Sequence, residues 1–172
     1  GARTRPIRLA RAVAEWKEFS ANAIKTTTRG KTTIMKPEGH ALDIATVGLG
    51  QAGGNLAAEF ARRGYRAIAL NTAHTDLASL DAGGVFPEMP EGRRLYIGLE
   101  GYDGAGADPI YGRQCIATHK ERIRMAVLEE AAAADVLVLA CGLGGGTGSA
   151  LTELIGVLEE DGIPMIALMT LP

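Results

Sequence analysis

The chain has 172 residues, a net charge of −2 at pH 7 and 47% hydrophobic residues, which suits one domain, or one domain with a tail, around an aliphatic core. No apolar run reaches the length of about 18 residues that a membrane-spanning helix needs, and the N-terminal residues lack the continuous apolar stretch of a secretory signal. Cys115 and Cys141 lie far apart without the spacing of a metal site, so we expect two reduced core cysteines in a cytoplasmic protein.

Basic residues are concentrated at the N-terminal end. Residues 1–36 carry nine basic and two acidic residues, a net charge of +7, whereas the remainder carries nine basic and eighteen acidic residues. Apolar residues recur at helical spacing over residues 7–24, and the threonine-rich segment 25–39 breaks this pattern. We therefore expect residues 1–40 to form a basic helical arm and linker, separate from a domain over residues 41–172.

The role of this arm stays open at the level of the sequence. A basic amphipathic helix can pack on its own domain, bind a protein partner, lie on a membrane surface or act as an organelle transit segment. Packing on its own domain is the simplest interpretation. A protein partner or a membrane is the alternative, and nucleic acid is the least favoured partner.

After the arm, strand patterns alternate with helical ones. Strands are expected at residues 42–48, 65–71, 93–98, 135–142 and 163–170, and helices at residues 55–64, 109–134 and 147–160. Asp108 is a candidate N-cap for the helix that Pro109 opens. This alternation predicts a three-layer α/β domain with a Rossmann-like, mainly parallel sheet, in which ligands bind at the carboxyl ends of the strands.

Three glycine-rich segments precede predicted helices at those ends. They are VGLGQAGGN (47–55), GAGADP (104–109) and ACGLGGGTGSA (140–150). Glycine lets the backbone bring its N–H groups against a ligand, and a helix start adds unpaired N–H donors and a partial positive charge. Thr147 and Ser149 add hydroxyl donors. A tight turn explains one such segment, but three in one sheet favour a bound anion such as a di- or triphosphate.

The spacing Gly48-x-Gly50-x-x-Gly53 also matches the dinucleotide-binding fingerprint GxGxxG. That fingerprint needs an acidic residue at the end of the second strand to bind a ribose, and Asn71 and Thr72 stand there instead. A dinucleotide site has no need of the third glycine-rich segment. No GxxxxGK[ST] loop is present, so the sequence disfavours an NAD-type enzyme and excludes a standard P-loop nucleotidase.

Four segments together resemble the tubulin/FtsZ family of GTP-binding, filament-forming proteins. GLGGGTGSA resembles the signature GGGTG[ST]G, with Ala150 in place of the last glycine. GLGQAGGN resembles the first nucleotide loop of tubulin and of its plasmid, phage and archaeal relatives, and NTAHTDL resembles the FtsZ sequence NTDAQAL. GAGADPIYGR resembles the loop that senses the third phosphate. The segments follow the family's order and spacing over residues 42–172.

The resemblance implies a bound guanine nucleotide, GTP or GDP, with Mg²⁺ accompanying GTP. No protein ligand set for Mg²⁺ is evident, as expected for an ion bound largely by phosphates and water. The implied ligand residues are Gly50, Gln51, Ala52, Gly53 and Gly54 at the phosphates and ribose, Asn55 near the guanine, Asn71 and Thr72 beside the phosphates, Ala105, Gly106 and Ala107 near the terminal phosphate, and Gly144, Gly145, Gly146, Thr147, Gly148 and Ser149 around the α- and β-phosphates.

The chain departs from the family pattern at several points. Ala73 stands in place of the aspartate of NTDA, and Glu153 is the candidate for the ribose-binding acid. The sequence ends at ALMTLP, where the family continues into a central helix and a loop whose acid positions the attacking water in the neighbouring subunit. We therefore expect the nucleotide-binding half of a filament-forming GTPase, with no catalytic residue assigned and slow hydrolysis by this chain alone. The alternative is a catalytically inactive scaffold or regulatory module that docks a partner through its basic arm.

Overall fold

The computed structural model describes residues 24–28, 31–35, 42–80, 89, 91–132 and 134–172. The chain divides into two units, residues 1–43 and residues 44–172, and each is described by itself. The helix expected over residues 7–24 lies outside the described residues, except for Ile24, which belongs to a strand.

The first unit contains a β-hairpin where the sequence predicts a linker. Strand β1 (Ile24–Thr28) pairs antiparallel with strand β2 (Lys31–Met35). The physical reason lies in the threonines, because their β-branched side chains restrict the backbone and favour the pleated surface of a strand. The local prediction for these ten residues is therefore corrected from linker to hairpin.

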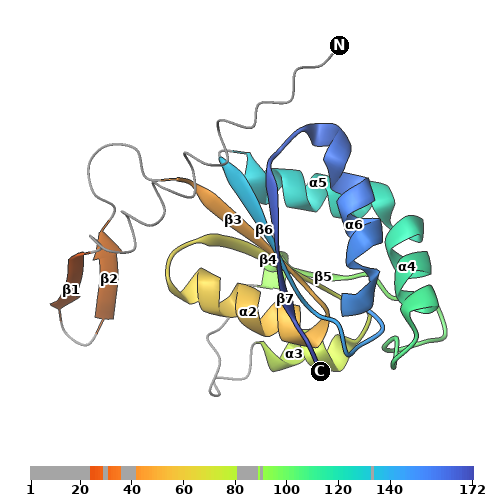
Figure 1. Cartoon of the computed structure of the whole chain (residues 1–172). Coiled ribbons are helices and arrows are strands. Elements are labelled where there is room, and N and C mark those ends of the chain that lie inside the picture. Colours follow the sequence, from red (N-terminus) through yellow and green to blue (C-terminus); the bar gives the residue numbers. More distant parts are fainter. Residues whose placement is uncertain (1–23, 29–30, 36–41, 81–88, 90, 133) are drawn as a thin grey trace, which may run out of the picture. The chain divides into compact units, whose positions relative to one another are not determined.

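The second unit is built on a five-stranded parallel sheet with the order β5-β4-β3-β6-β7. Its strands are β3 (Ile44–Leu49), β4 (Arg66–Asn71), β5 (Arg94–Tyr96), β6 (Val136–Gly142) and β7 (Met165–Thr170). Helices α2 (Gly50–Arg62) and α3 (His74–Ser79) cover one face, and α4 (Pro109–Thr118), α5 (Lys120–Ala131) and α6 (Leu151–Leu158) cover the other (Figure 1). This three-layer parallel α/β architecture confirms the predicted fold class.

The two faces of the sheet pack differently. Under α2 and α3 the core is rich in alanine, including Ala57 of α2 and Ala67 and Ala69 of β4, and small side chains let a helix lie close to the strands. The opposite face packs larger aliphatic side chains, such as Leu49 and Leu139, against α4, α5 and α6. The expected aliphatic core is thus present on both faces.

Both cysteines are core residues, as predicted. Cys115 and Cys141 are buried free thiols. Burial raises the pKa of each thiol, which keeps both in the neutral form and makes them poor nucleophiles. In the part of the chain that the structure describes, no helix has the length and apolar character needed to cross a membrane.

Residues 109–134 form two helices instead of the single predicted one. At His119, between α4 and α5, the backbone has φ −101° and ψ 16°, outside helical geometry. The His119 Nε2 atom lies 3.1 Å from the carbonyl oxygen of Gly98, so a tertiary polar contact accompanies the break. Asp108 caps α4 as predicted, because its carboxylate accepts a hydrogen bond from the Ile110 backbone N–H over 2.8 Å.

The helix predicted over residues 147–160 is also divided. A 3₁₀ turn (Gly148–Ala150) precedes α6, and a second one (Glu159–Asp161) follows it. Gly162 ends the segment with φ +68°, a left-handed conformation that favours glycine. Arg124 of α5 forms a bidentate hydrogen-bonded ion pair with Asp161 at this end. The guanidinium holds the pKa of the Asp161 carboxyl below its usual range.

Thr46 in β3 is a residue that we expect to lower the stability of the fold. It is fully buried, and no hydrogen-bond partner is found for its hydroxyl among the described residues. Because an unpaired buried hydroxyl costs about 1–3 kcal/mol, Thr46→Val is expected to raise the free energy of unfolding by about 1 kcal/mol. Urea denaturation measures this change, with the exposed Thr152→Val in α6 as the matched control. The prediction would be contradicted if Thr46→Val were less stable than the wild type while Thr152→Val kept the stability of the wild type.

Candidate functional site

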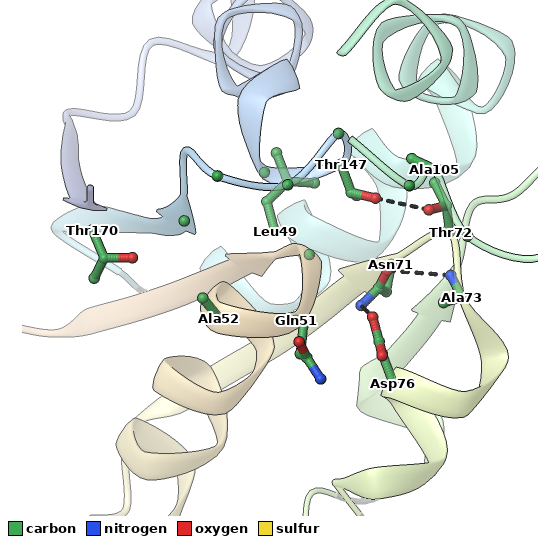
Figure 2. A pocket seen from close by; sticks show the side chains of 18 of the residues that line it. Leu49, Gln51, Ala52, Asn71, Thr72, Ala73, Asp76, Ala105, Thr147 and Thr170 are labelled. Carbon is green, nitrogen blue, oxygen red and sulfur yellow. Dashed lines mark hydrogen bonds between the residues drawn. The ribbon is translucent and has the colours of Figure 1, made fainter. Parts of the chain in front are cut away.

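A cavity of about 440 Å³ lies at the carboxyl ends of the parallel strands (Figure 2). The last residues of four strands line it, namely Leu49, Asn71, Gly142 and Thr170. This is the edge at which ligands bind in open α/β sheets. The sheet therefore places the cavity where the sequence predicts a ligand site.

The cavity brings together most of the predicted site residues. Those that line it are Gly50, Gln51, Ala52, Asn71, Thr72, Ala105, Gly106, Gly144, Gly145, Gly146, Thr147 and Gly148. Five predicted residues do not line it, namely Gly53, Gly54, Asn55, Ala107 and Ser149. Glu153, the candidate ribose-binding acid, does not line it either and lies in the first turn of α6.

Two of the glycines outside the lining serve the packing of α2. A methyl group on Gly53 would lie 2.2 Å from the carbonyl oxygen of Ala140 in β6, and one on Gly54 would contact Leu80. Because these glycines let the helix touch the sheet, α2 already begins at Gly50, five residues before the predicted start.

The start of α2 lies at the cavity. Gly50, Gln51 and Ala52 form its first residues, and the helix has neither a side-chain cap nor an acidic residue in its first turn. The first N–H groups of a helix have no partner within the helix and carry a partial positive charge. An anion at this edge of the cavity would meet donors that nothing else in the first turn satisfies.

The glycines of segment 142–150 line the cavity, and some of them also pack closely against other backbone. A methyl group on Gly148 would lie 2.2 Å from the carbonyl oxygen of Gly142, and one on Gly146 would lie 2.5 Å from that of Asp108. Gly145 faces open space, because a methyl group there would have no atom within 4 Å beyond its neighbours in the chain. The Ser149 hydroxyl donates to the Leu143 carbonyl oxygen over 2.8 Å, so it braces the loop itself instead of serving as the expected free donor.

Polar side chains are gathered at one end of the cavity (Figure 2). Thr72 and Thr147 are buried, and their hydroxyl oxygens lie 2.7 Å apart. The amide of Asn71 is fixed on both sides, because its Nδ2 donates to Asp76 Oδ2 over 3.0 Å and its Oδ1 accepts from the Ala73 N–H over 3.2 Å. This end therefore presents oriented hydrogen-bonding groups instead of mobile side chains.

Asp76 is a lining residue that sequence reasoning missed. It is the one ionisable side chain among the described residues that line the cavity, and it lies in the first turn of α3, three residues after Ala73. The segment NTAHTDL contains this acid. Asp76 lies about one helical turn after Ala73, which replaces the family's aspartate, so its side chain reaches the same region. No lysine or arginine lines the cavity in the described part of the chain, so backbone N–H groups must offset the charge of a bound anion.

A parallel α/β sheet with glycine-rich helix starts around a cavity at its carboxyl edge defines a nucleotide-binding class of domain. Comparison with known proteins identifies the member of that class. The model of the Tubulin/FtsZ family, GTPase domain, matches residues 43–172. The chain belongs to this family, which confirms the resemblance carried by its four segments.

Individual relatives agree with this assignment. The tubulin-like protein TubZ of Bacillus cereus is 34% identical over 155 residues, which cover 83% of this chain and 34% of that protein. The cell division protein FtsZ of Pseudomonas aeruginosa is 34% identical over 130 residues, which cover 75% of this chain and 31% of that protein. The chain thus spans about a third of the length of these relatives.

A solved structure extends the comparison to three dimensions. It is CetZ2 from Haloferax volcanii, a GTPγS-bound protofilament, with a TM-score of 0.58 and 29% sequence identity. The match covers 74% of this chain and 39% of that one.

Proposed function

We propose that residues 43–172 form the guanine-nucleotide-binding domain of a filament-forming GTPase and that the cavity binds GTP or GDP. The observation that carries this proposal is the convergence of residues 50–52, 104–106 and 144–148 on one cavity at the carboxyl edge of the sheet. All three segments offer backbone N–H groups, the donors that a polyphosphate needs where no cationic side chain lines the site. Membership of a GTPase family and the GTPγS in the CetZ2 structure support a guanine nucleotide.

The polar end of the cavity suggests how the nucleotide is oriented. We assign residues 50–52 and 144–148 to the α- and β-phosphates, and residues 105–106, beside Thr72 and Thr147, to the terminal phosphate of GTP. Asn55, which the resemblance places near the guanine, does not line the cavity, so we leave the base without an assigned partner.

Mg²⁺ is proposed to accompany GTP. We expect this ion to be bound mainly by phosphate oxygens and water. Asp76 is the cavity's candidate for a carboxylate that faces the ion or its water shell. The ion would also offset the repulsion between that carboxylate and the phosphates.

Thermal unfolding with GTP, GDP, ATP and NAD tests the identity of the ligand. A ligand at 100 times its Kd that binds only the folded chain stabilises it by about 2.7 kcal/mol. We expect GTP and GDP to raise the unfolding temperature and ATP and NAD to leave it unchanged. Stabilisation by NAD alone would favour an NAD-type enzyme. No response to any nucleotide, with a salt-sensitive interaction that is lost when residues 1–36 are deleted, would favour the scaffold alternative.

Hydrolysis by the chain alone is expected to be slow. Asp76 has the only carboxylate side chain among the described residues that line the cavity, and it already accepts a hydrogen bond from Asn71. Turnover by residues 1–172 should be on the order of 10⁻³ s⁻¹ or slower, the rate of a GTPase without its activating group. Phosphate release measured at increasing protein concentration checks this, and brisk, concentration-dependent turnover would contradict it. Hydrolysis on polymerisation is proposed for the whole protein, as is self-association into filaments.

A further inference from the structure

Asp103, outside the cavity, contacts the start of α3 from the loop between β5 and α4. Its Oδ1 accepts a hydrogen bond from the His74 backbone N–H over 2.8 Å and lies 3.1 Å from His74 Nδ1. Ala73, the N-cap residue of α3, has no side-chain oxygen and provides no side-chain cap. Asp103 therefore supplies, from a distant loop, an acceptor for one of the N–H groups at the start of α3 that have no partner within the helix.

Tyr96 supports this contact from the end of β5. The His74 ring stacks on the Tyr96 ring, with centroids 3.6 Å apart and an interplanar angle of 21°. The Tyr96 hydroxyl donates to the Tyr102 carbonyl oxygen over 3.0 Å, one residue before Asp103. The hydrogen bond from the His74 backbone holds the pKa of the Asp103 carboxyl below its usual range, so Asp103 is the charged acceptor at neutral pH.

The residues that follow Asp103 directly line the cavity. Gly104 N–H donates to the Thr72 carbonyl oxygen over 2.8 Å, and the Gly106 carbonyl oxygen accepts from Gly146 N–H over 2.9 Å. Gly104 and Gly106 have φ values of +96° and +54°. Because glycine populates left-handed and right-handed conformations about equally, the segment's own preferences do not fix its path. Its anchor points must do so, and at the N-terminal end these are the hydrogen bond from Gly104 to Thr72 and the contact of Asp103 with His74.

We propose that Asp103 and His74 form a latch that holds residues 104–106 where they line the cavity, which makes Asp103 a positioning residue for the terminal phosphate. The inference rests on the proposed function, which assigns that phosphate to residues 105–106. A ligand binds only the fraction of molecules whose segment is in place, and its apparent affinity falls with that fraction. The latch thus strengthens the binding of GTP more than that of GDP, which lacks the third phosphate.

Titration of residues 1–172 with GTP and GDP tests the latch in three variants. Asp103→Ala is expected to weaken GTP binding about fivefold, the change that corresponds to a lost capping bond of about 1 kcal/mol, and to change GDP binding less than twofold. Asp103→Asn keeps an acceptor for the His74 N–H and should stay within about twofold of the wild type for both nucleotides. Glu100→Ala removes the same charge from an exposed position in the same loop and should bind as the wild type does.

Equal weakening of GTP and GDP in Asp103→Ala, or no weakening, would overturn the latch, because a general loss of structure does not discriminate between them. The latch would also be overturned if Asp103→Asn bound GTP as weakly as Asp103→Ala does. The charge of Asp103, and not its hydrogen bond to His74, would then be what strengthens GTP binding.

Amide hydrogen exchange without nucleotide gives an independent readout. Asp103→Ala should speed exchange at the Gly104 and Gly146 amides, whose acceptors are Thr72 and Gly106. Unchanged exchange at both amides would overturn the latch. Failure of the wild type to bind either nucleotide would instead overturn the proposed function, and the exchange data would still decide the latch.

Discussion

Replacing Gly53 with alanine is expected to lower the free energy of unfolding by about 3 kcal/mol or more, the upper range of the cost of overpacking a core. The new methyl group would lie 2.2 Å from the Ala140 carbonyl oxygen, a separation that neither backbone can tolerate without shifting. Any shift must move α2 against β6, two elements that between them line the cavity. Urea denaturation measures the loss, and nucleotide binding should be lost with the fold.

Gly156→Ala is the matched control for this substitution. Gly156 is also a helical glycine, in α6, but an added methyl group there meets no atom within 4 Å. Alanine favours a helix over glycine by about 0.5–1 kcal/mol, so this variant should be slightly more stable than the wild type. If both variants lost the same stability, close contact between α2 and β6 would not be the reason for Gly53.

Replacing Gly145 with alanine is expected to have the opposite profile, with an intact fold and a weakened site. Gly145 lines the cavity, its φ is not positive, and a methyl group there meets no protein atom within 4 Å. On the proposed assignment of residues 144–148 to the phosphates, the methyl group would crowd the bound nucleotide. Loss of one charge-assisted hydrogen bond of about 1.5–3 kcal/mol predicts at least a tenfold rise in the Kd for GDP, measured by calorimetric titration.

Gly92→Ala serves as the control for Gly145→Ala. It also adds a methyl group to open space, but at a position outside the cavity. Both variants should unfold at the temperature of the wild type without nucleotide. GDP affinity that is unchanged in Gly145→Ala would remove residues 144–148 from the proposed phosphate site.

Strands β3, β4 and β6 were predictable because parallel strands buried on both faces are continuous apolar runs, as in residues 135–142. The helix boundaries were less predictable from the sequence. The start of α2 at Gly50 contradicts the low helix propensity of glycine, and close packing on β6 overrides that propensity. The break at His119 coincides with a contact to Gly98, twenty-one residues away in the sequence, which no local pattern contains.

The candidate site was predictable as a set of segments but not residue by residue. Gly50 and Gly53 belong to one fingerprint, yet Gly50 lines the cavity and Gly53 packs on β6. Spacing alone cannot separate these roles, since both require the absence of a side chain. The pairing of Asp103 with His74 was missed because it depends on where a distant loop returns to the sheet.

Amide hydrogen exchange of residues 1–172 with and without GTP and Mg²⁺ tests whether the cavity is the guanine-nucleotide site. GTP should slow the exchange that occurs through local opening at residues 50–52, 104–106 and 144–148, the three segments that converge on the cavity. Helix α5 lies away from the cavity, so its exposed residues should exchange at the same rate with and without the nucleotide. Protection elsewhere in the described chain, with these three segments unchanged, would contradict the assignment of the cavity as the guanine-nucleotide site.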